Sequence, residues 1–301
     1  MTVPVTSDAE RTSALRDFIS LTKPRIISLL LVTTVIPMYV AGSPGWVEVV
    51  LVTLGGYLMA GGANAVNMYA DRDIDHHMAR TRLRPIPSGR MPAQAVLAFG
   101  VALAAAATWL LGHFINPLTA ALALAGFYFY ILVYTRWLKR TTPQNIVIGG
   151  AAGAFPPLVG WAAVTGRVDL TAVYLFLIVF FWTPPHFWAL ALLKQKDYGR
   201  AGVPMAPLVW GERETMDQML WYTCILLGLT LLPVSYGAFG MVYFGSAFAL
   251  GLALLIGVLR IRRAAAAGGN WAQPAWWVYK YSLLYLALLF VAMVVDRALY
   301  R

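Results

Sequence analysis

The sequence has few charged residues and very few acidic ones. Of its 301 residues, 12% are charged and only 13 are Asp or Glu, whereas 60% are hydrophobic. Soluble domains carry about 25% charged residues, so this composition excludes an ordinary soluble protein. The mean hydropathy of +0.67 indicates an integral membrane protein instead.

Cysteine is nearly absent, and the N-terminus lacks an apolar leader. The single Cys224 lies in an apolar segment, which excludes an intrachain disulfide and argues against a thiolate metal site. The first 25 residues contain Asp8, Glu10 and Asp17, so they match neither a cleavable signal peptide nor an acid-poor transit peptide. We therefore divide the chain into an N-terminal segment, residues 1–25, and a single membrane domain, residues 26–301.

Apolar segments long enough to cross a bilayer are abundant. About 20 predominantly apolar residues make one spanning helix, and the chain has nine such segments: 26–42, 47–70, 93–113, 117–136, 144–164, 169–192, 217–236, 240–260 and 276–296. The predicted fold is an all-α integral membrane protein with nine transmembrane helices in one bundle. An odd number of spans places the two termini on opposite sides of the membrane.

Basic residues alternate between the connecting loops. Cytoplasmic loops carry an excess of Lys and Arg, and here the N-terminal segment and every second loop hold 19 of the 23 basic residues. This predicts a cytoplasmic N-terminus. The net charge of +10 is then explained by topology and contact with anionic lipid headgroups, not by nucleic-acid binding.

Two of the predicted cytoplasmic loops are long, from about residue 71 to 92 and from about 193 to 216. Long loops tend to be functional. Each begins with a charged cluster that contains aspartate and continues into basic sequence rich in Gly and Pro. This likeness suggests a weak internal repeat of about four helices per unit, which is common in membrane proteins whose site lies between the halves.

The first long loop follows the segment N-M-Y-A-D-R-D-I-D, residues 67–75. At about 100° per residue, Asn67, Asp71 and Asp75 stack on one helix face over two turns. An amide and two carboxylates suit Mg²⁺, which prefers oxygen ligands and shares its shell with substrate phosphates. We therefore predict these three residues as metal ligands. Asp73 points to a different face, as a further ligand or as a salt-bridge partner.

Arginines follow these aspartates closely. Arg80, Arg82 and Arg84 carry planar guanidinium groups that bind phosphate oxygens in pairs. Carboxylates without a metal would repel a diphosphate, and arginines without carboxylates would bind any anion, so the combination favours a metal-bridged diphosphate. At the mouth of an apolar bundle, the rest of the substrate is expected to be a hydrocarbon. Metal would assist loss of diphosphate from an allylic carbon, and aromatic faces would stabilise the resulting cation.

A structural alternative applies to single charged residues at a membrane edge. Such residues usually mark the boundary and form solvated salt bridges that contribute little to stability. Lys194 and Asp197, one helical turn apart in the second long loop, could be such an ion pair. The stacked trio followed by R-T-R-L-R-P is not explained in this way. Its parallel with the second loop favours a functional role for Lys194 and Asp197 too.

Four motifs resemble the UbiA-type intramembrane prenyltransferases and, within them, the haem-directed branch. They are L-T-K-P-R (21–25), N-M-Y-A-D-R-D-I-D-H-H-M-A-R-T-R (67–82), T-P-P-H-F-W-A-L-A (183–191) and K-Q-K-D-Y-G-R-A-G-V-P-M (194–205). The likeness extends from the first helix to the last. It implies Mg²⁺-dependent transfer of the farnesyl group of farnesyl diphosphate to a vinyl group of haem B, with addition of water, to give haem O and diphosphate.

The residues and the resemblance together predict a complete site. The expected catalytic residues are Asn67, Asp71, Asp75, Lys194 and Asp197, and the expected substrate-binding residues are Lys23, Arg25, Arg80, Arg82, Arg84, Asn145, His186 and Tyr198. The second loop lacks the D-x-x-x-D of quinone-pathway members, which argues against a second metal site. The expected partners are farnesyl diphosphate, haem B, the bilayer and a downstream haem A synthase. The expected location is a bacterial plasma membrane, with the site near the cytoplasmic face.

Haem recognition has a weaker signal in the sequence. His186 follows two prolines inside the sixth predicted helix, where proline removes backbone donors and opens room for a ligand. It is either an axial ligand of haem iron or an internally hydrogen-bonded helix contact. Tyr134, Arg136 and Asn145 are expected to line the cytoplasmic pocket.

Two other functions are compatible with parts of the sequence. A related transferase could act on a quinone precursor or a chlorin-type acceptor, and an assay of haem B against 4-hydroxybenzoate would separate the two. A transporter or channel should place ionisable groups near the bilayer midplane. Lys280 is nearly alone in such a position, which favours chemistry at one membrane face.

Overall fold

A computed structural model describes residues 8–78 and 81–300, except for the side chains of residues 8–13 and Arg25. Within this part of the chain the secondary structure is entirely helical. The elements are α1 (Asp8–Thr22), α2 (Pro24–Ala41), α3 (Trp46–Ala70), α4 (Arg72–Asp75), α5 (Ala93–Phe114), α6 (Pro117–Tyr128), the π-helix η1 (Phe129–Leu138), α7 (Lys139–Thr141), α8 (Asn145–Gly149), α9 (Ala151–Thr165), α10 (Leu170–Leu193), α11 (Gln195–Arg200), α12 (Ala206–Val209), α13 (Glu212–Ser235), α14 (Met241–Ala266) and α15 (Ala272–Tyr300).

Eight helical segments of the described chain are long and apolar enough to cross a membrane. They are α3, α5, the run from α6 through η1 to α7, the run from α8 to α9, and α10, α13, α14 and α15. The remaining predicted span, 26–42, corresponds to α2. Helix α2 passes the same test in combination with Ala14–Thr22 of α1, from which it is bent by 49°. Counting that bent pair as one span gives the nine that the sequence predicts.

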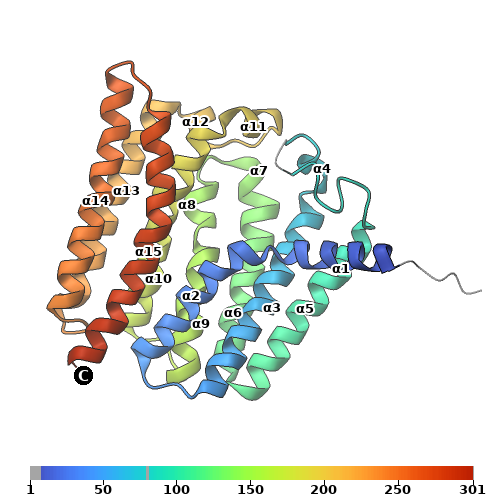
Figure 1. Cartoon of the computed structure of the whole chain (residues 1–301), viewed down its shortest axis with the longest axis horizontal. Coiled ribbons are helices and arrows are strands. Elements are labelled where there is room, and N and C mark those ends of the chain that lie inside the picture. The colour runs from blue at the N-terminus through green and yellow to red at the C-terminus, as the bar shows by residue number, and fades with distance from the viewer. Residues whose placement is uncertain (1–7, 79–80, 301) are drawn as a thin grey trace, which may run out of the picture.

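The two long loops lie at the same end of the bundle. Figure 1 shows α4, α7, α11 and α12 together at one end, whereas the C-terminal end of α15 lies at the other. Met78 of the first loop and Val203 and Met205 of the second belong to one buried apolar cluster. Both loops therefore contribute side chains to the main apolar core of the bundle.

Close helix packing fixes the helix that carries the aspartates. A Cβ atom added at Gly62 of α3 would lie 2.6 Å from the backbone oxygen of Gly100 in α5. Without side chains at this crossing the two backbones can approach closely, as in other membrane helix pairs. This contact holds α3 in place one to two turns before Asn67.

Helix α1 is joined to the first long loop. Leu21 is fully buried in a cluster with residues of α3, α5 and the loop. The guanidinium of Arg90, near the end of the loop, donates to both carboxylate oxygens of Asp17 (Nε to Oδ2, 2.9 Å) and to the backbone oxygen of Leu83. The N-terminal segment thus helps to position the loop that follows the aspartates.

Candidate active site

Asn67, Asp71 and Asp75 lie together on one helical face, as their spacing predicts. The backbone N–H of Asp71 donates to the oxygen of Asn67 and that of Asp75 to the oxygen of Asp71, both at 2.9 Å. The helical register thus continues past Ala70 into α4. The three residues are buried, with exposed fractions of 4%, 1% and 1%. Burying carboxylates is costly unless they are paired or coordinate metal, so their partners matter.

Asp71 has one satisfied oxygen and one unsatisfied oxygen. Its Oδ2 lies 2.5 Å from Nζ of Lys139 and accepts a 2.9 Å hydrogen bond from the amide of Asn67. Its Oδ1 lies 3.8 Å from a guanidinium nitrogen of Arg140 and is buried without a hydrogen-bond partner among the residues that the structure describes. A buried carboxylate oxygen with no donor is suited to receive a cation.

Asp75 is paired with an arginine of the loop that follows. Nη1 of Arg84 lies 2.6 Å from Oδ2 of Asp75, and Oγ1 of Thr81 donates to the backbone oxygen of Asp75 at 2.9 Å. The predicted Arg84 is therefore part of the cluster. Arg82 is exposed, and Arg80 lies outside the described residues.

Asp73 forms a salt bridge, which was one of its two predicted roles. Its carboxylate accepts two bonds from the Arg140 guanidinium, of 2.6 and 2.7 Å. Those bonds lower the pKa of Asp73 to about 2. The side chain is 58% exposed, in contrast to the buried trio on the neighbouring face.

The π-helix η1 contributes contacts that the sequence reading missed. Oγ1 of Thr135 accepts a 3.0 Å bond from the amide of Asn67 and donates to the oxygen of Tyr130, five residues earlier. Lys139 and Arg140 follow at the end of η1 and contact Asp71 and Asp73. A π-helix has more residues per turn than an α-helix and frequently occurs at functional sites. Arg136, which was expected to line the cytoplasmic pocket, is exposed.

Lys23 reaches the site from the break between α1 and α2. Its φ of 55° places it in the left-handed region, which is strained for a residue with a side chain and occurs preferentially at functional sites. Nζ donates to Oδ1 of Asn64 in α3 at 3.2 Å. Burial, followed by the nearby Arg84 and Lys139, lowers the pKa of Lys23 to about 7. The side chain of Arg25 lies outside the described residues.

The second long loop presents Lys194, Asp197 and Tyr198 next to α10. No ion pair joins Lys194 to Asp197 among the contacts of the described residues, contrary to the simple structural alternative. Nζ of Lys194 lies 6.0 Å from the ring centre of Trp276. Tyr198 is half-buried and packs against the main apolar cluster.

Asn145 connects the bundle to this second loop. Its side chain is completely buried, and its Nδ2 donates to the oxygens of Thr142 (2.7 Å) and Pro204 (3.3 Å). Its Oδ1 has no hydrogen-bond partner in the described part of the chain. Asn145 therefore lies at the end of the bundle where the cytoplasmic pocket was expected, and its Oδ1 is available to accept a hydrogen bond.

His186 is packed among aromatic rings. Its Nδ1 is 2.8 Å from Oγ of Ser282, and its ring stacks against Trp182 and Tyr279, with centroids 4.4 and 4.9 Å away. These are the contacts of an internally bonded helix residue. Ligation of haem iron by His186 stays a prediction.

A family model for the UbiA prenyltransferase family matches residues 29–278. The chain belongs to the UbiA prenyltransferase family. A protein of Roseiflexus castenholzii named protoheme IX farnesyltransferase is 57% identical over 290 residues, which cover 96% of this chain and 53% of that relative. The chain thus spans about half the length of this relative. A protein of the same name from Symbiobacterium thermophilum is 52% identical, over 93% of this chain and 94% of the relative.

Solved structures show that the fold is also that of UbiA proteins. The chain superposes with a TM-score of 0.74 on a structure described as digeranylgeranylglyceryl phosphate synthase, at 17% identity and covering 94% of this chain and 98% of that one. A UbiA homolog from Archaeoglobus fulgidus, bound to DMAPP and Mg²⁺, gives a TM-score of 0.69 at 14% identity, covering 91% and 99%. This UbiA-family chain is therefore a multi-pass membrane protein.

The donor set of the UbiA-family chain fits a divalent cation. The described residues contain no group of three or more His, Cys, Asp or Glu side chains that could hold a metal. The set here is instead two carboxylates and an amide, and the hydrogen bonds described for Asn67 use only its nitrogen. The unpartnered Oδ1 of Asp71 is available to a metal, and Mg²⁺ commonly combines one or two carboxylates with substrate phosphates.

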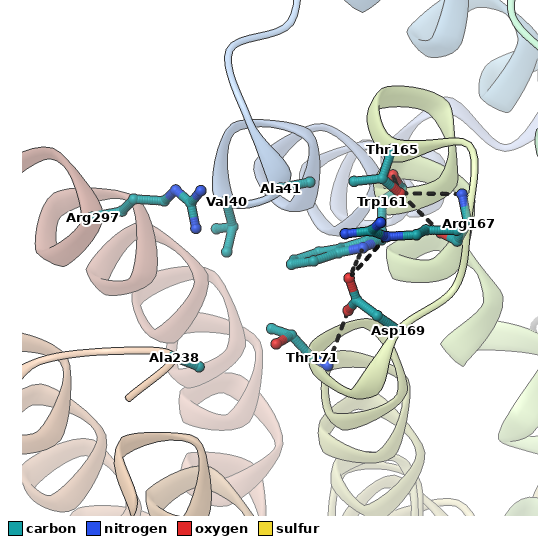
Figure 2. A pocket seen from close by; sticks show the side chains of 9 residues that line it. All are labelled: Val40, Ala41, Trp161, Thr165, Arg167, Asp169, Thr171, Ala238 and Arg297. Atoms are coloured by element: carbon teal, nitrogen blue, oxygen red, sulfur yellow. Dashed lines mark hydrogen bonds and ion pairs between the residues drawn. The ribbon is translucent and has the colours of Figure 1, made fainter. Parts of the chain in front are cut away.

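A cavity of about 240 Å³ lies at the opposite end of the bundle. Figure 2 shows Asp169 in one wall of the cavity, accepting a bond from Trp161 and capping the first turn of α10. None of the predicted site residues that the structure describes lines this cavity. Its lining consists of Val40, Ala41, Trp161, Thr165, Arg167, Asp169, Thr171, Ala238 and Arg297.

Proposed function

We propose that this chain transfers the farnesyl group of farnesyl diphosphate to a vinyl group of protohaem IX, with addition of water, to give haem O and diphosphate. The observation that carries the proposal is the buried cluster of Asp71 and Asp75, each held by a basic side chain, at one end of an apolar bundle. The name shared by relatives about 50% identical supports the choice of acceptor.

Asn67, Asp71 and Asp75 would hold Mg²⁺ in this proposal. The bound ion would act as a Lewis acid on the leaving diphosphate oxygens. Lys139 and Arg84 already lie against the carboxylates, so they are placed to contact a diphosphate that approaches the same oxygens. Lys23, at the break between α1 and α2, and Arg140, next to Lys139 in α7, add positive charge. A guanidinium group such as that of Arg140 can bind two phosphate oxygens at once.

The hydrocarbon part of the reaction would take place among apolar helices, away from water. The allylic C–O bond breaks and its electron pair leaves with the diphosphate. The vinyl π electrons of the acceptor then form the new C–C bond, and water adds to the cation left on the vinyl group and loses a proton. Exclusion of bulk water until that last step prevents simple hydrolysis of the allylic cation.

The proposal extends to the cellular setting. The basic end that holds the aspartates would face the cytoplasm of a bacterium, with residues 26–301 forming one membrane domain and the chain embedded in the plasma membrane. The concentration of Lys and Arg on that side supports this orientation. Haem O would then pass to an enzyme that oxidises it further, a haem A synthase.

The test is a reconstitution of the purified chain in nanodiscs with farnesyl diphosphate, haem B and Mg²⁺, and detection of haem O by mass spectrometry. We expect haem O and release of diphosphate only when all components are present. A parallel reaction with 4-hydroxybenzoate in place of haem B controls for a quinone-pathway activity. Prenylation of that acceptor without formation of haem O would refute the proposed function.

A further inference from the structure

Two lysines lie near one tryptophan at the end of the bundle that holds the site. Lys280 therefore lies at this end, next to Lys194, and not near the bilayer midplane as the sequence indicated. Nζ of Lys280 lies 5.9 Å from the ring centre of Trp276, and Nζ of Lys194 lies 6.0 Å from the same centre. Lys280 comes from α15 and Lys194 from the end of α10. Two segments 86 positions apart in the sequence thus bring two ammonium groups to one indole.

These lysines differ from the basic residues around the aspartates. Lys139, Arg84 and Arg140 each form an ion pair with a carboxylate. Lys280 and Lys194 have no ion pair among those found in the described residues. Contact with an aromatic face compensates little for a missing counter-ion. Lys280 and Lys194 are therefore available to bind an anionic group directly, without a metal ion between them and the anion.

The surface next to the pair is aromatic. Trp276 contacts the edge of Tyr279, with ring centroids 5.6 Å apart. Tyr279 stacks on His186, which in turn contacts Phe187. Trp276 and Phe187 are 40% and 38% exposed. A flat apolar ligand can pack on the exposed faces of Trp276 and Phe187, while its acidic groups reach the lysines.

We propose that Lys280 and Lys194 bind the two propionates of the porphyrin acceptor, with Trp276 near both. This assignment rests on the proposed function and adds the residues that recognise its second substrate. Protohaem IX carries its propionates on the edge opposite its vinyl groups. Holding the propionates at the membrane surface therefore directs the vinyl edge into the bundle. The two substrates then bind at two separate sites. The aspartate cluster binds the metal-bound diphosphate, and the two lysines bind the propionates without a metal.

The experiment compares two ligands that differ only in the propionates. The full chain in phosphatidylcholine nanodiscs is titrated with haem B and with haem B dimethyl ester, and the dissociation constants are measured by tryptophan fluorescence quenching. Wild type should bind haem B more tightly than the ester. The K194Q and K280Q variants should each lose about tenfold in affinity for haem B, and the double variant should bind both ligands alike.

Matched variants control for changes in folding and general charge. K196Q removes an exposed lysine two residues from Lys194 and should behave as wild type. K280R keeps the charge and should restore most of the preference for haem B. In the transferase assay, the double variant should raise the KM for haem B and leave the KM for farnesyl diphosphate unchanged.

Several outcomes would overturn the assignment. These are equal loss of affinity for haem B and its ester, no loss for either, or a raised KM for farnesyl diphosphate in K194Q. A loss that occurs only when anionic lipid is added would assign the lysines to lipid headgroups. Failure of the proposed function is distinct, because wild type would then form no haem O whatever its preference between the two ligands.

Discussion

Asp71 and Asp296 are both almost fully buried, with exposed fractions of 1% and 2%, but they are satisfied in different ways. Both oxygens of Asp296 accept backbone N–H bonds at the start of α14, from Gly240 at 2.6 Å and from Tyr243 at 3.0 Å. One oxygen of Asp71 is held by Lys139, and the other accepts no hydrogen bond from any residue that the structure describes. Fixed backbone donors satisfy a structural carboxylate, whereas side-chain cations can exchange for a ligand.

Replacing the carboxylates of the aspartate cluster should have the largest effect. We expect Asp71→Ala or Asp75→Ala to abolish turnover, with kcat lower by at least about a hundredfold, because each removes a predicted metal ligand. Membrane insertion should persist, with a lower Tm for Asp71→Ala because Lys139 loses its buried partner. Haem O formation by purified variants, with a melting curve for each, measures both. Near-normal turnover in either variant would refute the metal assignment.

Lys139 is the next test, because it balances the charge of Asp71. Lys139→Gln should lower kcat/KM for farnesyl diphosphate by about tenfold to a hundredfold, since a charge-assisted contact is lost. Lys139→Arg keeps the charge and should recover part of that loss. Steady-state kinetics at saturating haem B separate KM from kcat. An unchanged kcat/KM in the Gln variant would mean that Lys139 does not contact the substrate.

The sequence predicted the fold and the trio for clear physical reasons. Span length and the alternation of basic loops depend on bilayer thickness and charge, which act on each segment separately. The trio on one face, Asn67, Asp71 and Asp75, depends only on the helical repeat, which continues through this segment. The bend of 49° between α1 and α2 was not predicted, because the break at Lys23 depends on tertiary contacts.

Residues brought in by other helices could not be predicted in the same way. Lys139 and Arg140 contact the aspartates across a sequence separation of 67 or 68 positions. Their register is set by the π-helix η1, which no periodicity in the sequence indicated. The pairing of Lys280 with Lys194 around Trp276 likewise depends on how α15 packs on α10. The weak internal repeat stays a prediction.

Lys23 makes the aspartate cluster sensitive to pH. Its pKa is lowered to about 7 from 10.5, so the unfolded chain binds more protons between these values and the free energy of unfolding rises with pH there. A bound diphosphate favours the charged lysine. We therefore expect proton uptake on binding farnesyl diphosphate at pH 8, and affinity that falls by at most about tenfold per pH unit above pH 7.

Calorimetry in two buffers of different ionisation enthalpy measures that proton uptake. Lys23→Met should abolish it and flatten the pH dependence, because the substitution removes the group whose pKa is lowered to about 7. Proton uptake that persists in Lys23→Met would assign it to a different group.

Asp73 should matter much less than the aspartates on the next face. Asp73→Asn weakens an exposed salt bridge to Arg140, and such pairs are worth about 0–1 kcal/mol. We expect a change of about threefold or less in kcat/KM, measured beside Asp71→Asn as the matched buried change. The pKa of Asp73 is about 2, so its ion pair should persist to low pH and be lost as the pH falls through that value. A loss as large as that of Asp71→Asn would make Asp73 a ligand.

Replacing Asp296 should leave catalysis unchanged and should lower the stability of the fold measurably. Asp296→Ala removes the acceptor for two backbone N–H groups at the start of α14 and should cost about 1–2 kcal/mol, seen as a lower Tm in the same nanodiscs. The activity per folded molecule should equal that of wild type, because the aspartate lies at the end of the bundle opposite the proposed site. Asp296→Asn retains one acceptor oxygen and should fall between the two in Tm. A lower kcat for Asp296→Ala with an unchanged Tm would contradict this expectation. It would mean that a carboxylate bonded by backbone N–H groups, like Asp296, can affect catalysis as much as one paired with a side-chain cation, like Asp71.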